Sequence, residues 1–538
     1  MVPDTLDPHV TQAGPIANVH SAIFSKLLQY DDERAGTIVP DLADGMPEQP
    51  DALTYIVRLR DGVKFHDTPA FRLAHARTPG RPLDASDVKY SIERQLRSGS
   101  QRFFRQSQWT NIERIDVQDP RTLTISMKAP VAPFLAFLAG RHSFILPRNL
   151  AGAADRFDDP LSLIGSGPFM LDAFEQQNVV KLLRNPAWFA RDDRPDVGAG
   201  RPFLDAYNAY YSPQEDLFEQ VSFEHGRSDY ANFQDVAALV RERTTNLGDV
   251  VLEESDSGAV LSSRLLIDRA PFRDDRIRRA IHLAIDRRAL ADAVYPPMEG
   301  HASARLSGSI PPALDRWALA SGELETRPGY RSAASGRDED LRTAKQLWSA
   351  ALGDASIGDV HVMFTGVPKY VAAKGAPALQ GQLHDALGVN VVPAVDSSGY
   401  TLMAFAFGRN LDGATAGVVP FTFALEDTGV DLDDAVYAQF HSGQPLNTYR
   451  LQDPALDVLL DKSRAEFDTD ARRRLGIDIQ NYLVRNVNAR IEYCAPVLRR
   501  LRWGYVRNSR LPISAGADYQ LADLWLDSSH PAFAARPT

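Results

Sequence analysis

The sequence predicts an α/β fold that is divided into at least two lobes. A chain of 538 residues is too long to pack around one compact core. From residue 340 onward, predicted helices and strands alternate in the order that gives βαβ units and a mostly parallel sheet. Before that point most predicted elements are short strands, so we expect a β-rich first half and a more regular α/β second half.

The first half begins with a predicted helix over 21–32 and a predicted strand, LTYIVRLR, over 53–60. The strand alternates, with Leu53, Tyr55, Val57 and Leu59 on one face. Asp61-Gly62 follows it and predicts a hairpin turn, because glycine tolerates the positive φ of tight turns. We therefore expect the next residues, VKF, to return antiparallel to the strand.

A helix is predicted over 83–96, with Asp84 or Ser86 as its cap. Two strands around a polar turn are predicted over 114–130, and a short apolar helix over 133–140. The stretch GSGPF at 165–169 lacks the flanking pattern of a nucleophile elbow. It predicts a glycine-dependent turn that feeds a strand.

The second half contains the strongest helical pattern of the chain, over 270–295. Asp274 or Asp275 begins it, and its apolar stripe comprises Ile277, Ala280, Ile281, Ala284 and Ile285. Alternating helices and strands follow from 340, and two further helices are predicted over 453–486.

Composition and motifs exclude several classes of function. The net charge of −11 argues against a nucleic-acid partner, which would select a basic surface. The single cysteine, Cys494, rules out an intramolecular disulfide. No cofactor motif and no metal-ligand spacing is found: His66 and His142 stand alone, and an acidic cluster at 431–434 resembles a helix start. A hydrolase remains an alternative that no catalytic motif supports.

Many segments, in the right order, together resemble the family 5 extracellular solute-binding proteins, which serve ABC importers. TLDPHV (5–10) resembles the opening of that family, and residues 23–67 resemble its best-known stretch. The series continues with LDASDVKYSIER (83–94), GSGPFML (165–171), LLRNPAWF (182–189), PFRDDRIRRAIHLAIDRRALADAVY (271–295), and the segments 453–483 and 495–506.

The resemblance implies a two-lobed periplasmic-binding-protein fold with an extra β-rich domain inserted in lobe I. The implied ranges are lobe I at 1–44, 166–262 and 498–538, the extra domain at 45–165, and lobe II at 263–497. It also implies a monomeric, non-catalytic receptor that hands its solute to the permease subunits of an ABC importer. In this family the opening motif usually lies well downstream of an export signal. The resemblance therefore implies a periplasmic or membrane-anchored extracellular protein, although the first ten residues do not form a signal peptide.

The implied ligand is a peptide or peptide-like polar solute, and the alternatives are an oligosaccharide, an opine-like conjugate, haem or a metal chelate. Peptide-binding members typically carry an Asp-Tyr-Pro-Asp-Pro-like segment whose aspartate holds the peptide amino group. The matching region here, 403–443, lacks that segment. The candidate ligand-binding residues are Gln12, Phe104, Arg141, Tyr400, Phe407, Arg409, Asn410 and Asp431.

Two of these candidates have a stated role. Arg409 follows a predicted strand, MAFAF, where its guanidinium could bind a carboxylate or phosphate, or could simply lie on the surface. Asp431 is the first choice to pair with a peptide ammonium, with Glu426 and Asp427 behind it. The alternative is that Asp431, Asp433 and Asp434 begin a helix on the protein surface.

Overall fold

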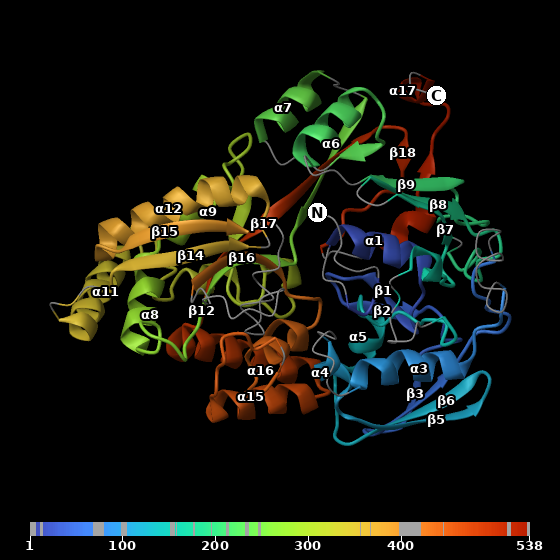
Figure 1. Ribbon diagram of the computed structural model, residues 1–538, viewed down its shortest axis with the longest axis horizontal. Coiled ribbons are helices and arrows are strands. Elements are labelled where there is room, and N and C mark those ends of the chain that lie inside the picture. The colour runs from blue at the N-terminus through green and yellow to red at the C-terminus, as the bar shows by residue number, and fades with distance from the viewer. Residues whose placement is uncertain are drawn as a thin grey trace. The chain divides into compact units, whose positions relative to one another are not determined.

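The computed structural model consists of two compact units (Figure 1). Unit 1 comprises Met1–Ser255 and Arg499–Thr538, and unit 2 comprises Asp256–Leu498. The domain ranges expected from the resemblance, including the inserted domain, stay predictions. The structure describes residues 7–10, 14–67, 80–97, 105–150, 157, 159–175, 178–194, 196–210, 215–231, 236–245, 249–353, 355, 357–365, 367–396, 421–444, 446–513 and 518–534.

Unit 1 is built from small antiparallel sheets and short helices. Its described helices are α1 (Gly14–Ile23), α3 (Ala85–Leu96), α4 (Gln106–Trp109), α5 (Phe134–Ala139), α6 (Glu215–Glu224), α7 (Val236–Thr245) and α17 (Pro531–Ala534). Its described strands are β1 (Leu28–Asp32), β2 (Thr37–Pro40), β3 (Glu48–Asp51), β4 (Thr54–Arg58), β5 (Ile112–Asp119), β6 (Thr122–Met127), β7 (Phe169–Glu175), β8 (Val179–Arg184), β9 (Ala206–Tyr210), β10 (Tyr230–Ala231), β11 (Val250–Asp256), β18 (Val506–Arg507) and β19 (Trp525–Leu526). Among the described residues, the sheets have the orders β1-β2, β3-β4-β6-β5, β7-β8-β9 and β18-β19.

The predicted strand at 53–60 is present, but the predicted hairpin is wrong. Strand β4 pairs with β3 before it and with β6 after it. Gly62 does adopt the positive φ of a turn, 71°. Beyond the turn, however, Lys64 bridges to Pro82 instead of returning along β4. The two flanking strands already occupy both edges of β4, so no edge is left for a hairpin partner.

Helix α3 forms as predicted and is tied to the N-terminal segment. Asp84 caps the helix: its carboxylate accepts the Ser86 N–H at 2.8 Å. Farther along α3, Arg94 is buried and donates from Nη1 to Oδ1 of Asp7 at 2.9 Å. The buried Asp7–Arg94 pair therefore joins residues 7–10 to α3.

The glycines of GSGPF allow one loop to contact the end of α1 and the segment after Gly62. Gly167 N–H donates to the carbonyl of Ile23 at 2.8 Å, and His66 N–H donates to the carbonyl of Gly165 at 2.8 Å. The His66 ring adds two contacts, because Nε2 faces the Gly167 carbonyl at 3.0 Å and Nδ1 lies 3.3 Å from Gly165 N. Nδ1 therefore accepts and Nε2 donates, which is the neutral form of the imidazole.

This geometry makes folding stability depend on pH through His66. Burial lowers the pKa of His66 from 6.5 to about 4, although the Gly167 carbonyl works in the opposite direction. Since the folded pKa lies below the unfolded one, the unfolded chain takes up the proton first as the pH falls below 6.5. Stability is therefore lost between pH 6.5 and about 4, and by pH 5.5 His66 accounts for about 1.4 kcal/mol.

Urea denaturation at pH 7.5 and 5.5 tests this prediction on the unmodified protein and on His66→Gln. Glutamine cannot take up the proton, so the variant is expected to lose about 1.4 kcal/mol less between the two pH values. The other buried histidines titrate alike in both proteins and cancel in the comparison. Equal losses in the two proteins would contradict the prediction.

Unit 2 is a mixed sheet with helices on it. Its described strands are β12 (Ala259–Leu265), β13 (Ala304–Leu306), β14 (Asp359–Thr365), β15 (Asn390–Asp396), β16 (Phe421–Asp427) and β17 (Arg490–Trp503), the last of which continues into unit 1. Its main described helices are α8 (Asp275–Ala284), α9 (Arg287–Val294), α11 (Arg337–Leu352), α12 (Lys369–Leu387), α15 (Pro454–Ala465) and α16 (Thr469–Tyr482). Strand order runs β17-β12-β16-β14-β15. Strand β14 is parallel to β15, as predicted, and to β16. However, β12 is antiparallel to β16 and β17, and β13 is antiparallel to β17, so the expectation of a mostly parallel sheet is wrong.

One face of this sheet carries the apolar core. Strand residues such as Leu261, Phe364 and Phe423 pack with side chains of α8, α9, α11 and α12. Figure 1 shows α9 and α12 beside strands β14 and β15. The opposite face of β12, β16 and β17 is polar, because side chains alternate between the faces along each strand.

The single helix predicted over 270–295 is in fact two helices. Asp274 caps α8 as predicted, and the predicted apolar stripe is buried. The chain then breaks at Ile285, and Asp286 caps α9 by accepting the Ala289 N–H at 2.9 Å. An Asp at an N-cap competes with the continuing helix, and here it starts a new one.

Candidate functional site

Most of the predicted ligand-binding residues lie outside the described part of the chain. These are Gln12, Phe104, Tyr400, Phe407, Arg409 and Asn410. Their roles, and the strand expected before Arg409, stay predictions. Arg141 in unit 1 and Asp431 in unit 2 are described.

Arg141 lies directly after α5 and is partly buried. Its Nε donates to Nε2 of His142 at 3.2 Å. Burial of His142, together with the Arg141 charge, holds the pKa of this imidazole well below 6.5. Arg141 therefore donates a hydrogen bond to a neutral imidazole ring.

Asp431 follows the carboxyl end of β16. Hydrogen bonds of the residues between them hold the backbone in place. Thr428 donates from N and from Oγ1 to the carbonyl of Gly258, at 3.2 and 2.9 Å. Gly429 follows with φ of 74°, and a Cβ there would lie 2.5 Å from the Cβ of Asp434. In α/β sheets the carboxyl ends of strands are the usual location of ligands, so this edge is our candidate site.

Asp431 itself is buried and already paired. Arg472 of α16 donates from Nη1 to Oδ2 at 2.9 Å, and its Nη2 contacts Oδ1. Burial raises the pKa of Asp431, but the Arg472 charge and its hydrogen bonds outweigh burial and leave the pKa below its ordinary value. The carboxylate is therefore ionised, with a partner from its own unit.

Asp433 has the same arrangement with a different arginine. Arg464 of α15 donates from Nε to Oδ1 at 2.8 Å and from Nη2 to Oδ2 at 2.6 Å. Both Asp431 and Asp433 are at most 4 % exposed. A short helix does begin here, at Asp433–Tyr437. The expected location on the surface is wrong, because two later helices bring guanidinium groups over Asp431 and Asp433.

The two acids that end β16 differ from each other. Glu426 is buried, contacts Nε of Arg264, and lies 3.8 Å from Nη2 of Arg490. Asp427, the next residue, points to the other face and is partly exposed. Its Oδ1 accepts the Gly429 N–H at 2.9 Å. Of these four acids, Asp427 is the one whose side chain is partly exposed.

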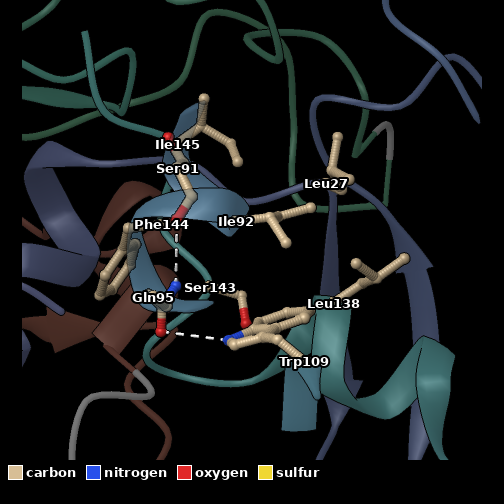
Figure 2. A pocket seen from close by; sticks show the side chains of 9 residues that line it. All are labelled: Leu27, Ser91, Ile92, Gln95, Trp109, Leu138, Ser143, Phe144 and Ile145. Atoms are coloured by element: carbon tan, nitrogen blue, oxygen red, sulfur yellow. Dashed lines mark hydrogen bonds between the residues drawn. The ribbon is translucent and has the colours of Figure 1, made fainter. Parts of the chain in front are cut away.

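A small cavity in unit 1 is not a solute site. Figure 2 shows it among α3, α4 and α5, with Trp109 Nε1 donating to Gln95 Oε1 at 3.2 Å. Gln95 Nε2 in turn faces the carbonyls of Ser91 and His142, both at 3.3 Å. About 10 Å³ is open to the centre of a water molecule, which is room for at most one water. The polar side chains of its wall all have hydrogen-bond partners within unit 1, since Ser91 Oγ donates to the Asp87 carbonyl and Ser143 Oγ to the Phe137 carbonyl.

The described residues hold no other candidate for chemistry. No three of their histidine, cysteine or carboxylate side chains are grouped to hold a metal ion. Cys494 is buried, which raises the pKa of its thiol well above the ordinary range and leaves it unreactive. None of the described helices combines the length and the apolar composition needed to cross a membrane.

Comparison with known proteins gives one family and one fold. The model of the bacterial extracellular solute-binding proteins, family 5 (middle region), matches residues 37–424. A probable di/tripeptide-binding protein of Pseudomonas aeruginosa (strain UCBPP-PA14) is 29% identical over 312 residues, which are 55% of this chain and 55% of that protein. The matched part thus spans about half the length of this curated relative.

Solved structures match over nearly the whole chain. An ABC transporter-associated periplasmic binding protein from Helicobacter pylori, in complex with a peptide, superposes with a TM-score of 0.77 at 20% identity, covering 97% of this chain and 96% of that one. A periplasmic binding protein from A. tumefaciens R10, in complex with agropinic acid, gives 0.77 at 19% identity, with coverage of 97% and 96%. The predicted fold class, a mixed α/β two-lobed periplasmic-binding-protein fold, is confirmed by these likenesses.

Proposed function

Since the chain belongs to the family 5 bacterial extracellular solute-binding proteins, we propose that it captures a peptide or peptide-like solute for an ABC importer. It would act as a non-catalytic monomer outside the cytoplasmic membrane, free or anchored, and release the solute to the permease subunits. The di/tripeptide-binding relative and the peptide-bound neighbour support a peptide ligand.

The observation that carries the peptide proposal is the unequal exposure of the four acids around the end of β16. Glu426, Asp431 and Asp433 are buried and face arginines of their own unit. Asp427 is partly exposed at the strand end. A peptide ammonium enclosed by a binding protein needs a carboxylate partner, because an uncompensated buried charge is costly. We assign that role to Asp427 in preference to Asp431.

Asp427→Asn is expected to weaken peptide binding at least tenfold, which corresponds to about 1.4 kcal/mol. The amide keeps the shape and can still accept the Gly429 N–H, but it loses the charge that would face the ammonium. Isothermal titration with a panel of di- and tripeptides measures the effect. N-acetylated peptides serve as the control ligands, since they lack the charge and should bind the two proteins alike.

Unchanged peptide affinity in Asp427→Asn would contradict this assignment. If Asp431→Asn instead lost peptide binding while keeping its melting temperature, the earlier candidate would be correct. A peptide-bound protein should also have a smaller radius of gyration in solution scattering, because enclosing the solute requires the lobes to close.

A second class of solute is favoured by one observation: the segment 403–443 lacks the peptide-type sequence described above. The agropinic-acid complex of a structural neighbour supports an opine-like conjugate as that alternative. Native mass spectrometry of protein purified without denaturation separates the two, because a captured solute is identified by its mass. Failure of every peptide to bind, with a captured sugar conjugate, would replace the peptide proposal.

A further inference from the structure

The polar face of the unit 2 sheet is buried as completely as its apolar face. Its side chains come from three adjacent strands and are at most 7 % exposed: Ser262 and Arg264 of β12, Thr422 and Glu426 of β16, and Arg490 and Glu492 of β17. Buried charges are retained only where other polar groups compensate them. The hydrogen bonds of this face can therefore be followed atom by atom.

Most of these hydrogen bonds are accounted for within unit 2. Arg264 contacts Oε1 of Glu426 and donates from Nη1 to Thr448 at 2.5 Å. Arg490 donates from Nη1 to Gln439 at 2.8 Å. Glu492 accepts the hydroxyl of Ser309 at 2.6 Å. The two arginines and two glutamates of the face thus balance in charge.

Four buried atoms of this layer take part in no hydrogen bond with the described residues. They are Glu426 Oε2, Arg490 Nη2, Thr422 Oγ1 and Tyr449 Oη. Thr422 is the cross-strand neighbour of Arg264, and the Arg264 guanidinium lies 5.4 Å from the centre of the Tyr449 ring. Burial raises the pKa of Tyr449 to about 12, so its hydroxyl remains a donor at neutral pH. The unpaired atoms therefore belong to one polar layer around Arg264.

We propose that this layer is a binding site for internal water, with one molecule bridging Arg490 Nη2 and Glu426 Oε2. These atoms are 3.8 Å apart, too far for a direct hydrogen bond but suited to a water about 2.8 Å from each. The occupant of this gap lies between a guanidinium and a carboxylate. It must therefore accept from the guanidinium and donate to the carboxylate, which a water does and an anion or a metal ion does not. The hydroxyls of Thr422 and Tyr449 also have no partner among the described residues, so we expect them to bind further water of this layer.

The proposal can be tested by removing the hydroxyls of Thr422 and Tyr449, because bound water and unpaired hydroxyls predict opposite changes in melting temperature. If water is bound, Thr422→Val and Tyr449→Phe each break a hydrogen bond and lower the melting temperature by about 2 °C. If the hydroxyls are buried without a partner, the same changes remove a desolvated polar group and raise the melting temperature. Tyr493→Phe is the matched control, because its hydroxyl makes a direct 2.6 Å hydrogen bond to Ser263 and its loss must destabilise.

A crystal structure of the unmodified protein gives the second measurement. Ordered water within hydrogen-bond distance of both Arg490 Nη2 and Glu426 Oε2 is the expected result. A direct Arg490–Glu426 hydrogen bond, or a side chain from residues 397–420 in that position, would overturn the proposal. So would a rise in melting temperature in both hydroxyl variants. Neither measurement depends on which solute the protein binds.

Discussion

Gly165→Ala is expected to destabilise the protein by roughly 3 kcal/mol or more and to leave little folded material. A Cβ at this position would lie 2.6 Å from the carbonyl carbon of Ile23 and would overlap its oxygen. Both are backbone atoms at the end of α1, so no side-chain rotation relieves the overlap. The loop would have to move away, which would also separate Gly167 from Ile23 and His66 from Gly165.

Thermal unfolding and the yield of soluble protein measure this effect. Gly45→Ala is the matched control in the same unit, since a Cβ at Gly45 meets nothing within 4 Å. The control should unfold as the unmodified protein does. A Gly165→Ala protein with an unchanged melting temperature would show that the contact between this loop and α1 does not exist as described.

Asp431→Asn is expected to lower the free energy of unfolding by about 3–5 kcal/mol. The change leaves the Arg472 guanidinium buried opposite a neutral amide, which cannot compensate its charge. Since the folded pKa of Asp431 is depressed, the same stabilisation should be lost in the unmodified protein as the pH falls through that pKa. Urea denaturation at neutral pH measures the difference directly.

The double variant Asp431→Asn with Arg472→Met tests whether the buried charge of Arg472 causes this loss of stability. Removing both charges removes the uncompensated guanidinium, so the double variant should be more stable than Asp431→Asn alone. Asp116→Asn serves as the surface control, because Asp116 pairs with Arg114 where both side chains are more than half exposed, and little change is expected. Equal stability of Asp431→Asn and the unmodified protein would mean that Arg472 is not the partner of Asp431.

Local patterns in the sequence predicted many of the elements but not their partners. The helix predicted over 21–32 is wrong, because α1 ends at Ile23 and strand β1 occupies Leu28–Asp32. Helix α3, the strands β5 to β7, the parallel pair β14 and β15, and the helices α15 and α16 were all predicted from local sequence patterns. The hairpin after Gly62 was wrong because strand pairing is not local. A turn residue shows that the chain turns, whereas β4 pairs with residues on both sides in the sequence, at 48–51 and 122–127.

The partners of the candidate-site residues could not be predicted from local sequence either. The sequence drew attention to the acids around Asp431, yet their environment depends on arginines 31 and 41 residues further along the chain. Nothing near Asp431 or Asp433 in the sequence indicates that Arg464 and Arg472 will cover them. A signal was available in the polar residues Thr422, Glu426 and Arg490, since charged residues at alternate positions of otherwise apolar strands indicate a polar face.

The way the chain divides between the units also determines the order in which they can be completed during synthesis. Unit 2 is one continuous segment, Asp256–Leu498, and all of its residues have been made before the ribosome reaches Arg499. Unit 1 includes Arg499–Thr538, so it cannot be completed until this later segment has been made. The second half of β17, which pairs with β10 at Tyr230, belongs to that late segment. The earlier segment of unit 1 therefore waits for residues 499–538, and unit 1 stays unfinished until they have been made.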